Sequence, residues 1–155
     1  MSISVPSALS VFSRTGAAVE LLAGWAKKAR GDRRALLLEL HDNLALLDLV
    51  ADGAATLDGV VDQLSAEQFE RLNREGYDFN RLQRRPIRRM RSLESTNLVY
   101  WQGKSTEDLV FGIYDKLREL QRLHRAVRQT DAVRWGQRVA NIRKRSWLLL
   151  RHLQA

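Results

Sequence analysis

Leucines recur at intervals of three and four residues between residue 33 and about residue 51, the spacing of one face of an α-helix. The leucines of this stripe are Leu36, Leu37, Leu40, Leu44 and Leu47, widened by Leu38 and Leu49. Asp42, Asp48 and Asp52 lie off the stripe, so the predicted helix is amphipathic. A helix with so continuous an apolar face normally buries it against partner helices, and the segment therefore favours an all-α fold.

The same spacing predicts further helices on both sides of this stripe. A first helix is expected to begin near Ser4 or Ser7 and to end near residue 30. The last is expected to be capped by Thr130 or Asp131 and to end near residue 153. Another long helix is expected after a cap at residue 105 or 106, and short helices over 57–64 and 66–75. Thr56 is the expected cap of the first short helix, and residues 65–68 form the expected capping box of the second.

Together these elements predict an antiparallel helical bundle of about four main helices, with short helices and an irregular basic insertion in the middle. The 155 residues and a hydrophobic content of 45% suit a single helical domain over 1–155. The chain has no cysteine, which excludes disulfides, thiol catalysis and cysteine-bound zinc. No apolar run approaches the ~18 residues of a membrane span, and no signal peptide is recognisable, so a cytoplasmic location is expected.

Residues 81–104, called the arginine segment below, interrupt the pattern of long helices. Six arginines fall within eleven of its residues, and Lys104 closes it; they are Arg81, Arg84, Arg85, Arg88, Arg89 and Arg91. Pro86 is expected to break a helix, so that one short helix precedes it and another follows it. Residues 94–105 are expected to form a loop, in which 98–101 have the composition of a short strand.

Charge is distributed unevenly along the chain, whose formal net charge is +8. Residues 1–53 carry no net charge, residues 54–80 carry −4, and residues 81–104 and 105–155 carry +6 each. Such asymmetry predicts a polyanionic partner, either DNA or RNA, or an acidic protein surface. Two alternatives stay open. The six carboxylates of residues 58–78 can neutralise the arginines, and 21 arginines against 5 lysines are also typical of a GC-rich genome.

Aromatic and helical residues extend the predicted binding surface. Tyr100 and Trp101 precede Lys104 in the expected loop, where they either contact the partner, for example by stacking on bases, or plug the end of the bundle. The arginines of the last two long helices that are predicted to join the surface are Arg122, Arg125, Arg134, Arg138 and Arg145. In the last helix, Trp147 and the three leucines after it suit either the bundle core or an anionic membrane surface.

Signatures of catalysis and of metal binding are sparse. His41, His124 and His152 lie far apart, no glycine-rich phosphate loop or nucleophile motif occurs, and neither a metal nor a cofactor is expected. One spacing, Arg118 followed by five residues and then His124, resembles that of HEPN-type ribonucleases, helical bundles whose Arg–His pair acts on RNA after dimerisation. The resemblance implies phosphate binding by Arg118 and acid–base chemistry by His124. His124 also lies in line with Leu120, where the alternative is a buried core histidine.

The sequence thus predicts a non-catalytic binding or accessory module whose cationic surface contacts nucleic acid. The alternative from another class is a protein–protein adaptor or homo-oligomeric scaffold that docks an acidic partner. The third hypothesis is a HEPN-like ribonuclease using Arg118 and His124.

Overall fold

The computed structural model describes residues 17–127 and 133–154, and within them every regular element is helical. The predicted all-α class is therefore confirmed, and no strand occurs in this part of the chain. The expected beginning of the first helix at Ser4 or Ser7, and the expected cap of the last at Thr130 or Asp131, lie outside the described residues.

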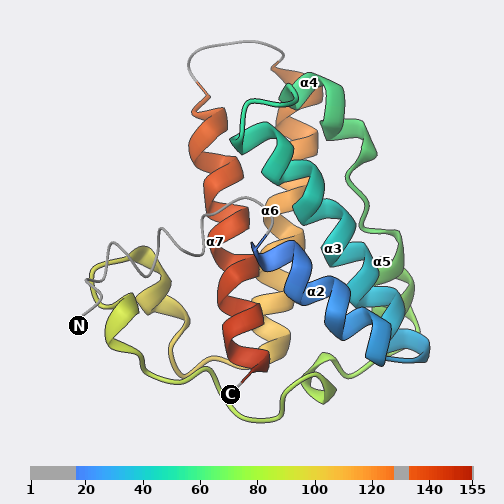
Figure 1. Ribbon diagram of the computed structural model, residues 1–155, viewed down its shortest axis with the longest axis vertical. Coiled ribbons are helices and arrows are strands. Elements are labelled where there is room, and N and C mark those ends of the chain that lie inside the picture. Colours follow the sequence, from blue (N-terminus) through green and yellow to red (C-terminus); the bar gives the residue numbers. More distant parts are fainter. Residues whose placement is uncertain (1–16, 128–132, 155) are drawn as a thin grey trace.

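Four long helices make up most of the structure. They are α2 (Ala17–Lys28), α3 (Gly31–Ala51), α6 (Thr106–Ala126) and α7 (Trp135–Leu153). Helices α6 and α7 run side by side in opposite directions, α3 packs against α7, and α2 packs on α3 (Figure 1). Their apolar faces meet in one core that contains, among others, Leu36, Leu40, Leu44, Ile113, Leu117, Val139 and Ile142.

In α7, the structure decides between the two alternatives for Trp147 and the three leucines after it, the bundle core and a membrane surface. Trp147 and the leucines at 148–150 are all buried, so they belong to the bundle core and are not free to contact a membrane. None of the described helices combines the length and the apolarity needed to cross a membrane.

Two short helices precede the arginine segment. Helix α4 (Leu57–Val60) continues into the 3₁₀ helix η1 (Val61–Gln63), and α5 (Glu67–Arg74) packs on α3. Thr56 caps α4 as predicted, since its side chain accepts a hydrogen bond from the Gly59 N–H. The capping box predicted over 65–68 is wrong, because the Ser65 hydroxyl oxygen accepts from the Glu67 N–H at 3.2 Å and not from the Gln68 N–H.

The N-terminus of α5 is capped instead by a carboxylate from another helix. Glu39 of α3 is buried and accepts hydrogen bonds from the backbone N–H groups of Gln68 at 2.7 Å and Phe69 at 3.0 Å, and from the Ser65 hydroxyl at 3.0 Å. A negative charge at a helix N-terminus is stabilising, and these three bonds satisfy the buried carboxylate. The sequence gives no sign of this cap, because Glu39 and α5 are distant along the chain.

Asp48 also departs from its predicted place, which was off the apolar leucine stripe. It is 4% exposed, and its Oδ1 accepts a hydrogen bond from Nε of Arg143 on α7 at 2.7 Å. This buried ion pair joins α3 to α7 and satisfies both charges in the core.

Residues between α5 and α6 form three separate short 3₁₀ helices rather than the predicted pair of short helices around Pro86. They are η2 (Phe79–Arg81), η3 (Arg91–Leu93) and η4 (Asn97–Trp101). The predicted strand at 98–101 is wrong, since these residues belong to η4. The segment passes below the ends of α6 and α7 and forms a small lobe beside α7 (Figure 1).

Candidate functional site

The backbone of the arginine segment is closed on itself. Ile87 N–H donates to the Lys104 carbonyl at 2.9 Å, and Gly103 N–H donates to the Ile87 carbonyl at 2.8 Å. Gly103 has φ of +83°, a left-handed conformation that glycine adopts without strain. Residues 87 and 103 are thereby held together, and the chain between them is a closed lobe rather than an open loop.

Side chains at the start of α6 and the end of α7 fasten this segment to the long helices. The Thr106 hydroxyl donates to the Gln83 carbonyl and lies 2.7 Å from Nε2 of His152. Because that hydroxyl proton is used, Nε2 of His152 donates to the Thr106 oxygen. Burial, and secondarily the charge of Arg88, lowers the pKa of His152, so the ring is neutral at pH 7. The same helix begins with a cap at Ser105, one of the two residues expected there, and Asp108 completes it as a capping box.

Apolar side chains of the segment point inward and its arginines point outward. Leu82, Ile87, Leu93 and Leu98 are buried in the core. All six arginines of the segment, Arg81, Arg84, Arg85, Arg88, Arg89 and Arg91, are exposed. The alternation follows from the cost of burying an unpaired charge, and it presents the guanidinium groups on a fixed backbone.

Within the described chain, one ion pair involves these six arginines, between Arg84 and Asp78 at 3.6 Å. Three of the other five carboxylates that precede the segment have partners elsewhere. Asp58 pairs with His124, Glu70 with Arg118, and Glu75 with Arg71. The alternative of self-neutralisation therefore applies to Arg84 alone, and only weakly, because exposed pairs contribute little.

Tyr100 and Trp101 have opposite environments although they are adjacent. The Tyr100 side chain is 66% exposed, and Nζ of Lys104 lies 4.3 Å from its ring centre. Trp101 is 8% exposed, and its ring lies against Gly112 of α6, where a Cβ atom would meet the ring at 2.9 Å or less. Trp101 therefore plugs the space beside α6, while Tyr100 alone is free to stack on a partner.

Arg145 of α7 lies over the ring of Trp101. Its guanidinium carbon lies 5.2 Å from the Trp101 ring centre, and Nη1 donates to the Gly112 carbonyl at 3.0 Å. Burial lowers the pKa of Arg145, but a guanidinium stays charged at neutral pH. Of the helical arginines predicted to join the cationic surface, Arg145 is the one that lies against the arginine segment, through η4.

The other helical arginines are either paired or remote. Nη1 of Arg138 donates to Glu119 at 2.8 Å, and this bond, followed by that from Lys116, lowers the pKa of Glu119. Arg122 and Arg125 are exposed, roughly 25 Å along α6 from the end that adjoins the segment. Arg134 is exposed at the beginning of α7, again far from the segment. The structure thus divides the single predicted surface into separate parts.

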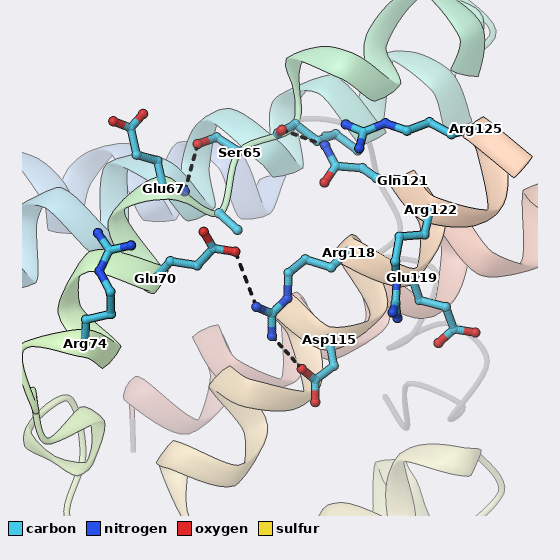
Figure 2. Close-up of a pocket in the computed structure, with 12 residues that line it drawn as sticks. Ser65, Glu67, Glu70, Arg74, Asp115, Arg118, Glu119, Gln121, Arg122 and Arg125 are labelled. Carbon is cyan, nitrogen blue, oxygen red and sulfur yellow. Dashed lines mark hydrogen bonds and ion pairs between the residues drawn. The ribbon is translucent and has the colours of Figure 1, made fainter.

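A cleft of about 690 Å³ between α5 and α6 is lined by two of these helical arginines, Arg122 and Arg125. Arg118 reaches across it from Asp115 at 3.0 Å to Glu70 at 3.3 Å, and Arg122 and Arg125 lie further along the same wall (Figure 2). Its charged lining balances, with four arginines and four carboxylates: Arg74, Arg118, Arg122, Arg125, Glu67, Glu70, Asp115 and Glu119. A polyanion gains little from a surface with no net charge.

Arg118 and His124 face different parts of the molecule. Arg118 is in the cleft just described, whereas His124 is buried, hydrogen-bonded to Asp58 and in edge contact with Trp135 at 5.6 Å between ring centres. Their spacing on one helix does not bring them together within one chain, and each is occupied by other partners. The arrangement is that of a core histidine, the alternative to the ribonuclease pair.

No three His, Asp or Glu side chains gather as a metal site in residues 17–127 and 133–154. Comparison with models of known protein families, with curated proteins and with solved structures gives no match for this chain. The function must therefore be argued from the arginine segment and its surroundings.

Proposed function

We propose that the protein is a non-catalytic nucleic-acid-binding module whose arginine segment contacts the phosphate backbone. One observation carries the proposal: five of the six exposed arginines have no ion pair among the described residues. The antiparallel bundle of long helices serves as the platform, and a cytoplasmic location belongs to the same proposal.

Free guanidinium groups on a fixed backbone suit a phosphate chain. Each group offers five N–H donors in a planar fork, and each phosphate it neutralises releases a counterion. Because the segment is already held by hydrogen bonds to α6 and by its own closure, binding orders side chains and not the backbone. The acidic-partner alternative engages the same arginines but predicts no affinity for nucleic acid.

The test is a salt titration of binding to fluorescent single- and double-stranded DNA and RNA, after purification in high salt with nuclease. We expect a linear plot of log affinity against log salt with a slope of roughly −3.5 for a single strand, if all five unpaired arginines contact phosphates. Such a slope corresponds to a loss of affinity of roughly 100-fold between 50 and 200 mM salt. Absence of binding at low salt would contradict the proposal and favour the acidic protein partner.

A further inference from the structure

A small pocket lies directly beside the arginine segment, between η4 and α7. Its volume is about 170 Å³, and its lining residues are Asn97, Leu98, Tyr100, Trp101, Asn141 and Arg145. Helix η4 contributes four of them and α7 contributes two. The composition, two aromatic rings, two amides and a guanidinium, is unlike the charge-balanced cleft between α5 and α6.

The polar groups of the pocket are available to a ligand. The side-chain amides of Asn97 and Asn141 make no hydrogen bond to another described residue, and Asn97 is exposed. Arg145 uses Nη1 for the Gly112 carbonyl and lies over Trp101, which leaves further N–H donors. An amide carries both donors and acceptors, and it can therefore pair with the edge of a nucleobase.

Tyr100 supplies an aromatic surface at the rim. Its ring is largely exposed and stands edge-on to Trp101, with an angle of 85° between the planes. Lys104 lies over the ring, so a positive charge accompanies the stacking surface. An exposed aromatic side chain beside unpaired amides has the elements of a site for one base.

The end of the arginine run packs beside the 3₁₀ helix that lines this pocket. Helix η3, which carries Arg91, packs on η4, and the side chain of Gln102 just after η4 donates to the Met90 carbonyl at 3.4 Å. A nucleotide chain that follows the arginines toward η4 therefore arrives at Tyr100 and the two amides. Bases in a duplex are stacked and paired on their Watson–Crick edges, so only an unpaired base can enter.

We propose, resting on the function proposed above, that the pocket between η4 and α7 takes one unpaired base of a single-stranded nucleic acid. Tyr100 stacks on the base, the amides of Asn97 and Asn141 bond to its edge, and the arginine segment holds the flanking phosphates. The protein is thereby selective for single strands and has a preference among bases at one position.

The experiment compares dissociation constants for single-stranded 12-mers of each base, as RNA and as DNA, with those for a duplex of the same length. We expect single strands to bind at least tenfold more tightly than the duplex. Tyr100→Ala should weaken single-strand binding roughly 5- to 150-fold, the range for loss of one stacked base, and leave duplex binding unchanged. Asn141→Ala should change the order of preference among the bases and leave the salt slope unaltered.

Val99→Ala is the matched control. Val99 lies on the same 3₁₀ helix and is 43% exposed, but does not line the pocket, so its removal should leave every dissociation constant unchanged. Because Tyr100 is exposed and Asn141 is outside the core, both variants should keep the far-ultraviolet circular dichroism of the native protein.

Failure of this inference is distinguishable from failure of the proposed function. One pattern of results would exclude the base pocket and leave the phosphate-binding function standing. In it, the native protein binds duplexes as tightly as single strands, Tyr100→Ala binds normally, and Arg88→Glu/Arg89→Glu abolishes binding. If no nucleic acid binds at low salt, both are excluded. A preference for RNA or for DNA among the single strands supports the pocket and adds which sugar it accepts.

Discussion

Two sets of arginines in this protein have the same chemistry and opposite surroundings. Those of the arginine segment lie outside the α-helices and are exposed, and only Arg84 has an ion pair among the described residues. On α6 and α7, Arg118, Arg138 and Arg143 each pair with at least one carboxylate, and Arg145 lies over Trp101. Residues 81–104 and residues 105–155 carry the same formal net charge, +6.

Two regions of equal formal charge therefore do not offer equal numbers of guanidinium groups to a binding partner. A guanidinium that already holds a carboxylate must give up that bond before it can hold a phosphate, whereas an exposed one exchanges only water and counterions. Under the proposed function, these four helical arginines serve the cohesion of the fold and those of the segment serve binding, while the exposed Arg122 and Arg125 are too remote to take part. The predictions below test this division, beginning with the largest expected effect.

Arg143→Met should lower the free energy of unfolding by about 3 kcal/mol, because it leaves the buried Asp48 carboxylate without this partner. Chemical denaturation by urea, followed by circular dichroism, measures the change. The matched control is Arg89→Met in the segment, which should cost less than about 0.5 kcal/mol since Arg89 is exposed and has no ion pair among the described residues. Equal losses in the two variants would contradict the division.

Reversal of charge should separate the two sets by binding rather than by stability. Arg88→Glu/Arg89→Glu should weaken binding to a single-stranded 12-mer at least tenfold at low salt and make the salt slope shallower, because phosphate contacts are lost. Arg122→Glu/Arg125→Glu, with the same change in net charge at the remote end of α6, should weaken binding by less than about threefold through the long-range field alone. A larger effect at α6 would place the contact surface there.

Gly112→Ala tests the close packing of Trp101 on α6, which buries Trp101 while its neighbour Tyr100 is exposed. The added methyl group would lie 2.9 Å or less from the Trp101 ring, so the ring must shift, and we expect a loss of about 1 kcal/mol in the free energy of unfolding. Gly24→Ala in α2 is the control, since it meets no atom within 4 Å and should stabilise by about 0.5 kcal/mol through helix propensity. Unchanged tryptophan fluorescence and unchanged stability in Gly112→Ala would show that Trp101 does not occupy this position.

The smallest effect concerns the pH dependence of the attachment between the segment and the bundle. The pKa of His152 is lowered in the folded state, chiefly by burial and then by Arg88, so the unfolded chain binds its proton more readily. Its contribution to stability should be complete above the ordinary histidine pKa of about 6.5 and should decline as pH falls from there toward the folded-state pKa.

The measurement is urea unfolding of the native protein and of His152→Gln between pH 7.5 and 5. His41 and His124 are present in both proteins, so the difference between the two pH profiles isolates His152. We expect the native protein to lose more stability than the variant over this interval. Parallel profiles would indicate that protonation of His152 costs the fold nothing.

The helices could be predicted because their signals are local. The leucine stripe of α3, the cap at Thr56 and the cap at Ser105 all lie within a few residues of the element they define. Glu39 was missed as the cap of α5 because its partners Gln68 and Phe69 come from a distant part of the chain.

Which side chains of the arginine segment are exposed and unpaired was harder to predict than where the segment lies in the sequence. The cluster of arginines between 81 and 91 is visible in the sequence. Whether nearby carboxylates pair with them depends on the fold, which directs Glu70 to Arg118 and Asp58 to His124. Tyr100 and Trp101 looked equivalent, and the room that Gly112 leaves for one ring decides which of them is buried. The amides of Asn97 and Asn141 were not predicted at all, because their juxtaposition requires η4 to pack on α7.

The most direct test of the division between the two sets is nuclear magnetic resonance of the arginine side-chain Nε–H groups, with and without a single-stranded 12-mer. In the free protein, the signal of Arg143, whose Nε–H bonds to Asp48, should persist, while those of the exposed segment arginines exchange rapidly with water. Adding the oligonucleotide should bring out and shift the signals of Arg85, Arg88, Arg89 and Arg91 and leave Arg143 and Arg138 unchanged. Shifts confined to the arginines of α6 and α7, with no response from the segment, would contradict the account.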